Sequence, residues 1–192
     1  MRRFLYLLTL VTFILPSAIA APYSEQTQEC IEQMKNENAA YAAKDWPQLE
    51  RIARRVIQSC SGIDPDIVAS AYQNISTACN ETNRPKEALD AAVSCIEFSY
   101  AYSAGCHIEK IRALMALGRF AEAKASLEIA EPLLRQLLSQ TELCIRNARS
   151  SSERELCMDR KDGYQIKLKY IQLVREKLEV LDKSGKIHEP IQ

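Results

Sequence analysis

Seven cysteines are the residues of this 192-residue chain whose number and spacing could support chemistry. Pairs of cysteines can form disulfides, bind zinc as thiolates, or take part in thiol–disulfide exchange. The last two, Cys144 and Cys157, enclose the segment CIRNARSSSERELC, in which twelve residues separate the thiols. Because the count is odd, at least one thiol is free or pairs with another chain. The other five are Cys30, Cys60, Cys79, Cys95 and Cys106.

Zinc binding and redox catalysis are the less favoured uses of these cysteines. The chain has no CxxC motif, the close spacing that is typical of zinc sites and of thiol oxidoreductases. It has two histidines, His107 and His188, and no second pair of ligands accompanies the adjacent Cys106 and His107. We therefore predict no metal and no other cofactor, and disulfides are the default interpretation.

The N-terminus predicts the compartment in which these thiols fold. Two arginines precede an apolar run over residues 4–15, and the Ala-Ile-Ala that ends at Ala20 has the pattern of a signal-peptidase site. We expect a signal peptide over residues 1–20 and a mature chain that begins at Ala21. An uncleaved membrane anchor is the alternative, but the apolar run is shorter than the roughly 20 residues that spanning requires.

Export would place the mature chain in the periplasm or outside the cell, where disulfides form and persist. No later stretch is long and apolar enough to span a bilayer, so we expect no membrane insertion after signal cleavage. Without the two signal-peptide arginines, the chain has 23 Lys and Arg against 25 Asp and Glu, a net charge of −2. A nucleic-acid binder would show a basic excess or stripe, so we expect no nucleic-acid partner.

Helical periodicity runs through nearly the whole mature chain and predicts an all-α fold. Apolar residues recur at intervals of three and four, and no segment shows the alternation of a strand. Asp45 before Pro47 and Asp64 before Pro65 are typical of helix starts. Pro132 is expected to kink or split the sixth helix. The predicted helices cover residues 25–43, 47–60, 65–81, 85–99, 104–117, 120–148 and 152–183, with a flexible tail over 184–192.

The turns between the helices are similar in sequence and recur at a regular distance. The segments AAKDWPQLERIARRV, CNETNRPKEALDAAV and MALGRFAEAKASLEI have their anchor residues, Trp46, Pro85 and Phe120, 39 and 35 residues apart. A period near 34 in helix–turn–helix units is typical of tetratricopeptide repeats, which the chain resembles over about residues 28–135. Small or apolar residues follow each anchor at fixed positions: Leu49, Ala88 and Ala123, then Ala53, Ala92 and Leu127.

Hairpins of this kind are expected to stack, because one helical hairpin is unable to bury its own apolar face. We predict about three repeats over residues 21–135, forming a short α-solenoid that is capped by a C-terminal helical hairpin over 136–183. An unrelated helical bundle is the alternative. The last helix carries an apolar stripe that can cover the third repeat, formed by Tyr164, Leu168, Ile171, Val174, Leu178 and Leu181.

The predicted hairpins select one of the 15 pairings that six cysteines allow. Antiparallel helices bring residues at equal distances from a turn within disulfide range. Chain reversals near residues 45, 100 and 150 lie midway between cysteines, and a capping box of Ser152 with Glu155 predicts where the last helix starts. We predict the disulfides Cys30–Cys60, Cys95–Cys106 and Cys144–Cys157, with Cys79 as a buried free thiol.

The resemblance implies a binding groove, because the first helix of each tetratricopeptide pair lines a concave surface that holds partner peptides. Asn38 and Asn74 match two asparagines of the carboxylate clamp found in chaperone-binding members. Met34, Gly105 and Glu109 stand where that clamp has its basic residues. The implied groove consists of Met34, Asn38, Tyr41, Gln73, Thr77, Asn80, Ile108, Arg112 and Met115. The alternative interpretation is that these are ordinary surface residues.

Enzyme activity is not expected from this sequence. No set of residues supplies a nucleophile, a base and a stabilising group together, and the five glycines form no phosphate-binding loop. Sequons at Asn74 and Asn80 would accept glycans if the source glycosylates exported proteins. The sequence therefore predicts an exported, tetratricopeptide-like adaptor or scaffold that binds a protein or peptide in an envelope or secreted assembly. The alternative is a secreted helical effector or inhibitor that acts through its C-terminal hairpin.

Overall fold

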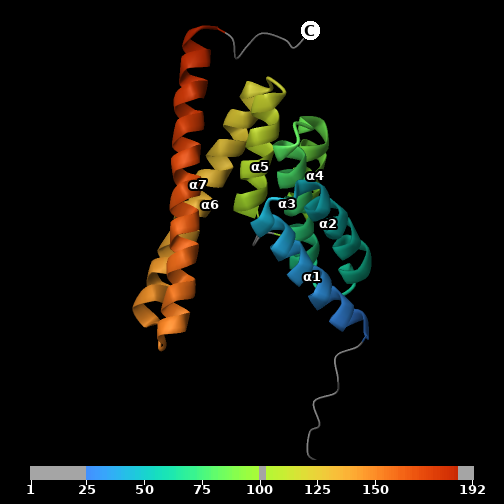
Figure 1. The fold of residues 1–192 in the computed structure, drawn as a ribbon. Helices are drawn as coiled ribbons and strands as arrows, with labels where there is room; N and C mark the ends of the chain where they lie inside the picture. The colour runs from blue at the N-terminus through green and yellow to red at the C-terminus, as the bar shows by residue number, and fades with distance from the viewer. Residues whose placement is uncertain (1–24, 100–102, 186–192) are drawn as a thin grey trace, which may run out of the picture.

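The computed structural model describes residues 25–99 and 103–185, so the predicted signal peptide and the end of the predicted tail lie outside the described residues. Within these ranges the chain forms seven α-helices and no strand, which confirms the all-α prediction (Figure 1). None of these helices combines the length and the apolar character needed to cross a membrane. The helices are α1 (Glu25–Ala43), α2 (Trp46–Cys60), α3 (Pro65–Glu81), α4 (Pro85–Phe98), α5 (Ser103–Ala116), α6 (Phe120–Asn147) and α7 (Ser151–Lys183).

The start of α7 is set by a different serine from the predicted one. The Ser150 hydroxyl oxygen accepts a hydrogen bond from the backbone N–H of Glu153 at 3.1 Å. The Glu153 carboxylate in turn accepts one from the backbone N–H of Arg149 at 2.8 Å. The predicted cap at Ser152 is therefore wrong by two residues. Three consecutive serines offer the same cap chemistry, and the earliest one lets the helix add backbone hydrogen bonds at its N-terminus.

The turns after α1, α3 and α5 share one backbone geometry. In each, one residue has a left-handed conformation, with φ of 56° at Lys44, 57° at Asn83 and 71° at Gly118. The next N–H donates to a carbonyl five residues earlier, which is the Schellman closure of a helix. These bonds recur with the spacing of the sequence repeat, and they run from Asp45 to Ala40 (3.0 Å), Arg84 to Cys79 (2.8 Å) and Arg119 to Leu114 (2.9 Å).

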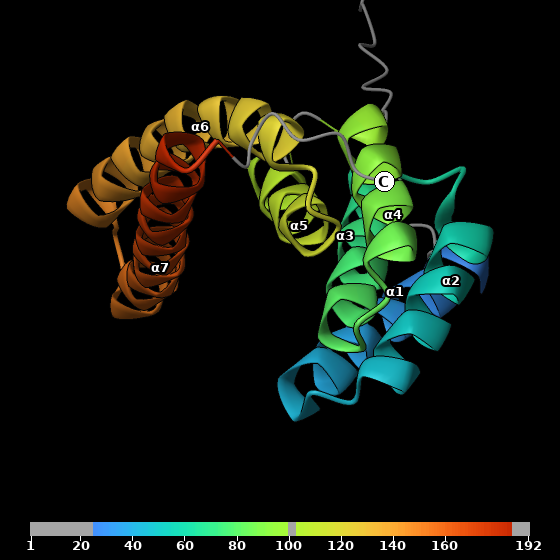
Figure 2. The same cartoon turned by 90° about the horizontal axis from the view of Figure 1, so that it is seen from above.

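The helices are arranged as successive antiparallel neighbours. Each helix packs against the next one along the chain, and α3 also contacts α5. Seen from above, the helices follow an arc with α7 at one end and the α1–α2 hairpin at the other (Figure 2). The fold is thus repeat-like, and α3, α5 and α7 face the inner side of the arc.

Small residues at the repeat positions allow this close stacking. Leu49, Ala88 and Ala123, which follow the three anchors, are fully buried. Ala53, Ala92 and Leu127, four positions further on, are 3% exposed or less. An alanine at a helix interface lets the neighbouring backbone approach closely, and burial of apolar surface stabilises the stack by roughly 25 cal/mol per Å².

The apolar stripe of α7 covers α5 and α6. Ile171, Val174 and Leu178 belong to one buried cluster that also contains Ile108 and Ile111 of α5. α6 contributes its own leucines to the same cluster and is not split at Pro132, although its axis curves (Figure 2). Because α6 runs unbroken past residues 135 and 136, the predicted repeats and the predicted C-terminal hairpin share a helix.

Disulfides join three pairs of helices, with the pairing that the spacing predicts. Cys30–Cys60 links α1 to α2, Cys95–Cys106 links α4 to α5, and Cys144–Cys157 links α6 to α7. Their Cα atoms lie 5.6, 5.9 and 6.1 Å apart, within the usual range for disulfides. Cys79 is a free thiol and is fully buried.

Candidate binding cleft

A cleft of about 640 Å³ is formed by α3, α5, α6 and α7. This volume is within the range of about 300–1,000 Å³ that is usual for ligand sites. α5 and α6 give the cleft an apolar lining, whereas α3 and α7 supply most of its polar groups. The lining residues are Asp66 and Gln73 of α3, Ala104 and Gly105 of α5, Leu134 and Leu137 of α6, and Arg160, Tyr164 and Lys167 of α7.

The three cleft residues of α7 lie on one face of that helix. Arg160, Tyr164 and Lys167 follow i, i+4, i+7 spacing, so their Cα atoms extend over about 10 Å of helix axis. Arg160 is exposed, and Lys167 is only partly exposed. Burial lowers the pKa of Lys167, and the nearby Glu109 carboxylate partly opposes this shift. Within the described ranges, neither cation forms a salt bridge.

The side-chain amide of Gln73 lies directly against Gly105 of α5, where a larger residue would push this flexible amide aside. A Cβ atom at Gly105 would lie 2.8 Å from the amide nitrogen and oxygen of Gln73, which is closer than real Cβ contacts. The absence of a side chain at residue 105 therefore lets the Gln73 amide lie in the wall of the cleft, where it offers both a donor and an acceptor.

The charge of the cleft lining is positive. Asp66 is the single carboxylate among the lining residues, and it already accepts a hydrogen bond from the Ser99 hydroxyl. Two cations thus face one engaged carboxylate. A neutral or cationic ligand would add no anion beside the partly desolvated Lys167, whose charge Glu109 stabilises only in part.

Polar side chains also join α3 to α5. The Asn80 amide donates to the Glu109 carboxylate at 2.8 Å, and Arg112 donates to Glu109 at 3.1 Å and to Glu81 at 2.5 Å. Tyr170 of α7 lies beside Arg112 and Glu109, and burial raises its pKa to about 12. These side chains join the helices to one another, so Asn80 and Arg112 act in the packing of the inner face.

The nine predicted groove residues do not form one open surface. Thr77 and Ile108 are each 6% exposed. The Thr77 hydroxyl bonds the Gln73 carbonyl, and Ile108 belongs to the buried cluster that also contains residues of α7. The prediction that they line an accessible groove is therefore wrong for these two. Gln73 lines the cleft, and Asn38 and Tyr41 are exposed on α1. Met34 and Met115 pack partly against the core.

Both sequon asparagines have their amides engaged. Asn74 bonds the buried Glu37 carboxyl of α1, and burial raises the pKa of that carboxyl. Asn80 bonds Glu109, as described above. A glycosylated amide keeps one N–H, so the attached sugar would have to fit beside these interhelical contacts.

One group of potential metal ligands exists among the described residues. Donor atoms of Glu50, Cys79 and Glu87 lie within 4.8 Å of one another. The guanidinium of Arg84 forms salt bridges with both glutamates, so a cation already occupies this group. Burial raises the pKa of the Cys79 thiol to about 11, which keeps it protonated at neutral pH. The arrangement joins α2, α3 and α4 and needs no metal.

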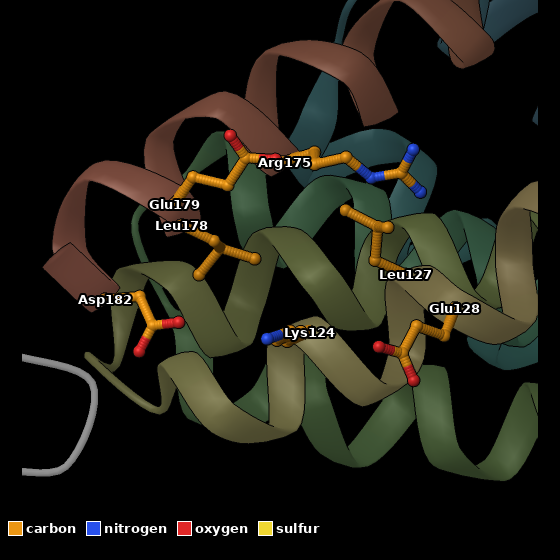
Figure 3. Close-up of a pocket in the computed structure, with 7 residues that line it drawn as sticks. All are labelled: Lys124, Leu127, Glu128, Arg175, Leu178, Glu179 and Asp182. Carbon is orange, nitrogen blue, oxygen red and sulfur yellow. The ribbon is translucent and has the colours of Figure 1, made fainter.

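A smaller hollow lies between α6 and α7. It has a volume of about 170 Å³, and Figure 3 shows leucines and charged side chains of both signs around it. This volume is below the usual range for ligand sites, and the mixed charges do not select one ligand. Its residues are Lys124, Leu127, Glu128, Arg175, Leu178, Glu179 and Asp182.

Sequence reasoning did not identify the three α7 residues of the cleft as site residues. The i, i+4, i+7 spacing of Arg160, Tyr164 and Lys167 places them on one face, but the same spacing is common on solvated helices. Only the packing of α7 across the inner side brings them opposite Gln73. A comparison of the chain with protein-family models, with curated proteins and with solved structures finds no match.

Proposed function

We propose that this protein is an exported, tetratricopeptide-like adaptor that binds a segment of a protein partner on its inner face, in the periplasm or outside the cell. Three disulfides agree with an oxidising compartment. The repeated turn geometry after α1, α3 and α5 supports the likeness to tetratricopeptide repeats. We propose that the protein acts by binding its partner and not by catalysis.

The observation that carries this proposal is the cleft between α3 and α7. Its lining combines apolar residues of α5 and α6 with polar and charged residues of α3 and α7, so it offers contacts for a segment that has both an apolar and a polar part. It faces the inner side of the arc, where α3 and α5 correspond to the first helices of the second and third predicted repeats.

Affinity capture from the native envelope, read by mass spectrometry, tests the proposal with two variants of α6. Leu137→Trp would fill the cleft, and Ile129→Trp changes an exposed isoleucine on the same helix. We expect a partner that the wild type and Ile129→Trp retain and that Leu137→Trp loses by at least tenfold. Circular dichroism would verify that both variants keep their helices. Equal retention by both variants would place the binding surface elsewhere.

The second candidate function, an effector or inhibitor that acts through the C-terminal hairpin, is supported by exposed apolar residues near its tip. Leu143, Leu156 and Met158 are each about half exposed, close to the Cys144–Cys157 disulfide. Leu156→Asp combined with Met158→Asp should abolish target binding if this surface acts. The same double variant should leave binding in the cleft unchanged.

A further inference from the structure

We infer that the cleft between α3 and α7 receives a carboxylate carried on a short apolar peptide segment. This inference rests on the proposed function and specifies the chemistry of the partner. The carboxylate would lie at Lys167, with Arg160 at the outer part of the same helix face. The apolar portion would lie against Leu137 and the ring of Tyr164.

The charge requirement follows from the surroundings of Lys167. Its ammonium is partly removed from water, and the Glu109 carboxylate that attracts it also accepts hydrogen bonds from Asn80 and Arg112. Asp66, the carboxylate in the cleft lining, accepts a bond from Ser99. The lining therefore carries two cations and one carboxylate, and a ligand carboxylate would balance the second cation.

The apolar requirement follows from the opposite wall. Leu134 is fully buried and Leu137 is partly exposed, and both come from α6 behind the cleft. A polyanion such as a nucleic acid would leave this apolar lining in contact with phosphate groups, which is unfavourable. The Gln73 amide, held over Gly105, can bond the peptide backbone next to the carboxylate.

Two sources of a carboxylate on a peptide need separate probes, namely the chain end and an acidic side chain. The first pair of probes is acetylated trileucine with a free C-terminal carboxylate and the same peptide as the carboxamide. The second pair is an acetylated leucine tripeptide amide with a central aspartate and its counterpart with asparagine. Nuclear magnetic resonance titration of the labelled mature protein would follow the backbone amide signals of Ala104 and Gly105.

We expect at least one carboxylate probe to shift the Ala104 and Gly105 signals and to bind about tenfold or more tightly than its neutral counterpart. One charge-assisted hydrogen bond is worth about this factor. Lys167→Met should remove the preference, and Lys167→Arg should largely restore it. Lys169→Met, at an exposed position on the same helix, should keep it. The pair that shows the preference identifies the source of the carboxylate.

Two results would overturn this inference. Carboxylate and neutral probes that shift the cleft signals equally would show an apolar site without charge selection, and the adaptor function would stand. Probes that leave Ala104 and Gly105 unshifted would remove the peptide carboxylate as a ligand. Loss of the captured protein partner in Leu137→Trp would still test the adaptor function independently, because that experiment does not use these probes.

Discussion

At the scale of single residues, two buried titratable groups have polar atoms without a hydrogen-bond partner among the described residues. These atoms are Oε1 of Glu37 and Nδ1 of His107. Burial raises the pKa of Glu37 and lowers the pKa of His107 to about 4, with Lys110 adding to the second effect. Burial therefore favours the neutral form of both groups.

His107 makes the stability of the protein depend on pH in mildly acidic solution. The unfolded chain takes up a proton on this imidazole near pH 6.5, whereas the folded chain does so near pH 4. Lowering the pH through this window therefore favours the unfolded state, by about 2 kcal/mol at pH 5 for the full shift. Urea unfolding at pH 7 and pH 5 should show this loss in the wild type and a much smaller one in His107→Leu.

Other titrating groups can be separated from His107 in that experiment. The pKa values of Glu50, Glu122 and Glu131 are lowered by their arginine partners, so their contributions are lost only at more acidic pH. Glu37 acts in the opposite direction, because its raised pKa makes the folded state gain stability as the pH falls. A pH effect of the same size in both proteins would exclude His107 as its source.

At the scale of elements, α7 has two structural roles. One face carries the apolar stripe that covers α5 and α6, and the neighbouring face contributes Arg160, Tyr164 and Lys167 to the cleft. A third side is exposed and carries isolated apolar residues such as Leu173. The rotation of α7 about its own axis therefore decides both the core of the C-terminal region and the composition of the cleft.

Two neighbouring positions on α7 should differ sharply in their contribution to stability. Ile171 is 2% exposed within the cluster shared with α5, and Leu173 is 64% exposed. Ile171→Ala should cost about 2–5 kcal/mol of unfolding free energy through lost burial and the cavity left behind. Leu173→Ala should change it by about 0.5 kcal/mol or less. Chemical denaturation measures both, and similar costs would mean that α7 is rotated or not docked.

At the scale of the whole molecule, the disulfides join consecutive helices and differ in their relation to the core. Cys30 and Cys60 belong to the main buried cluster of α1 to α4. Cys95 and Cys106 form a smaller cluster with Ala69 of α3. Cys144 and Cys157 are outside the three buried clusters of the described residues, near the tip of the α6–α7 hairpin. The first disulfide therefore stabilises the global fold, whereas the last holds the end of one hairpin.

Removal of these two disulfides should have different consequences. Replacing Cys30 and Cys60 by alanine should lower the unfolding free energy by about 2–5 kcal/mol, the usual loss for a native disulfide. Replacing Cys144 and Cys157 should lower it less and should raise hydrogen exchange mainly in residues near the tip. Calorimetry measures the loss of unfolding free energy, and hydrogen-exchange mass spectrometry locates the residues whose exchange increases. Equal global losses would contradict this division.

The sequence by itself determined the helices, the repeated turns and the cysteine pairing, because each depends on short-range physics. The 3.6-residue period, the caps at Asp45 and Asp64, and a turn midway between two cysteines act over a few residues or one hairpin. The one incorrect detail of the helix boundaries discussed above is small, because the predicted N-cap Ser152 lies two residues after the observed N-cap Ser150. The assignment of the chain as a tetratricopeptide-like adaptor rests on the same sequence repeat and stays a prediction.

Only the tertiary structure decided which residues meet on the inner face. The cleft joins Gln73 of α3 to Lys167 of α7, and these residues are far apart in the sequence. Burial of Thr77 and Ile108, which the sequence placed in an open groove, depends on how the helices pack and how α7 is rotated. A helical pattern specifies which residues share a face of one helix. It leaves open which other helix that face contacts, because the choice is made by the sum of many long-range contacts.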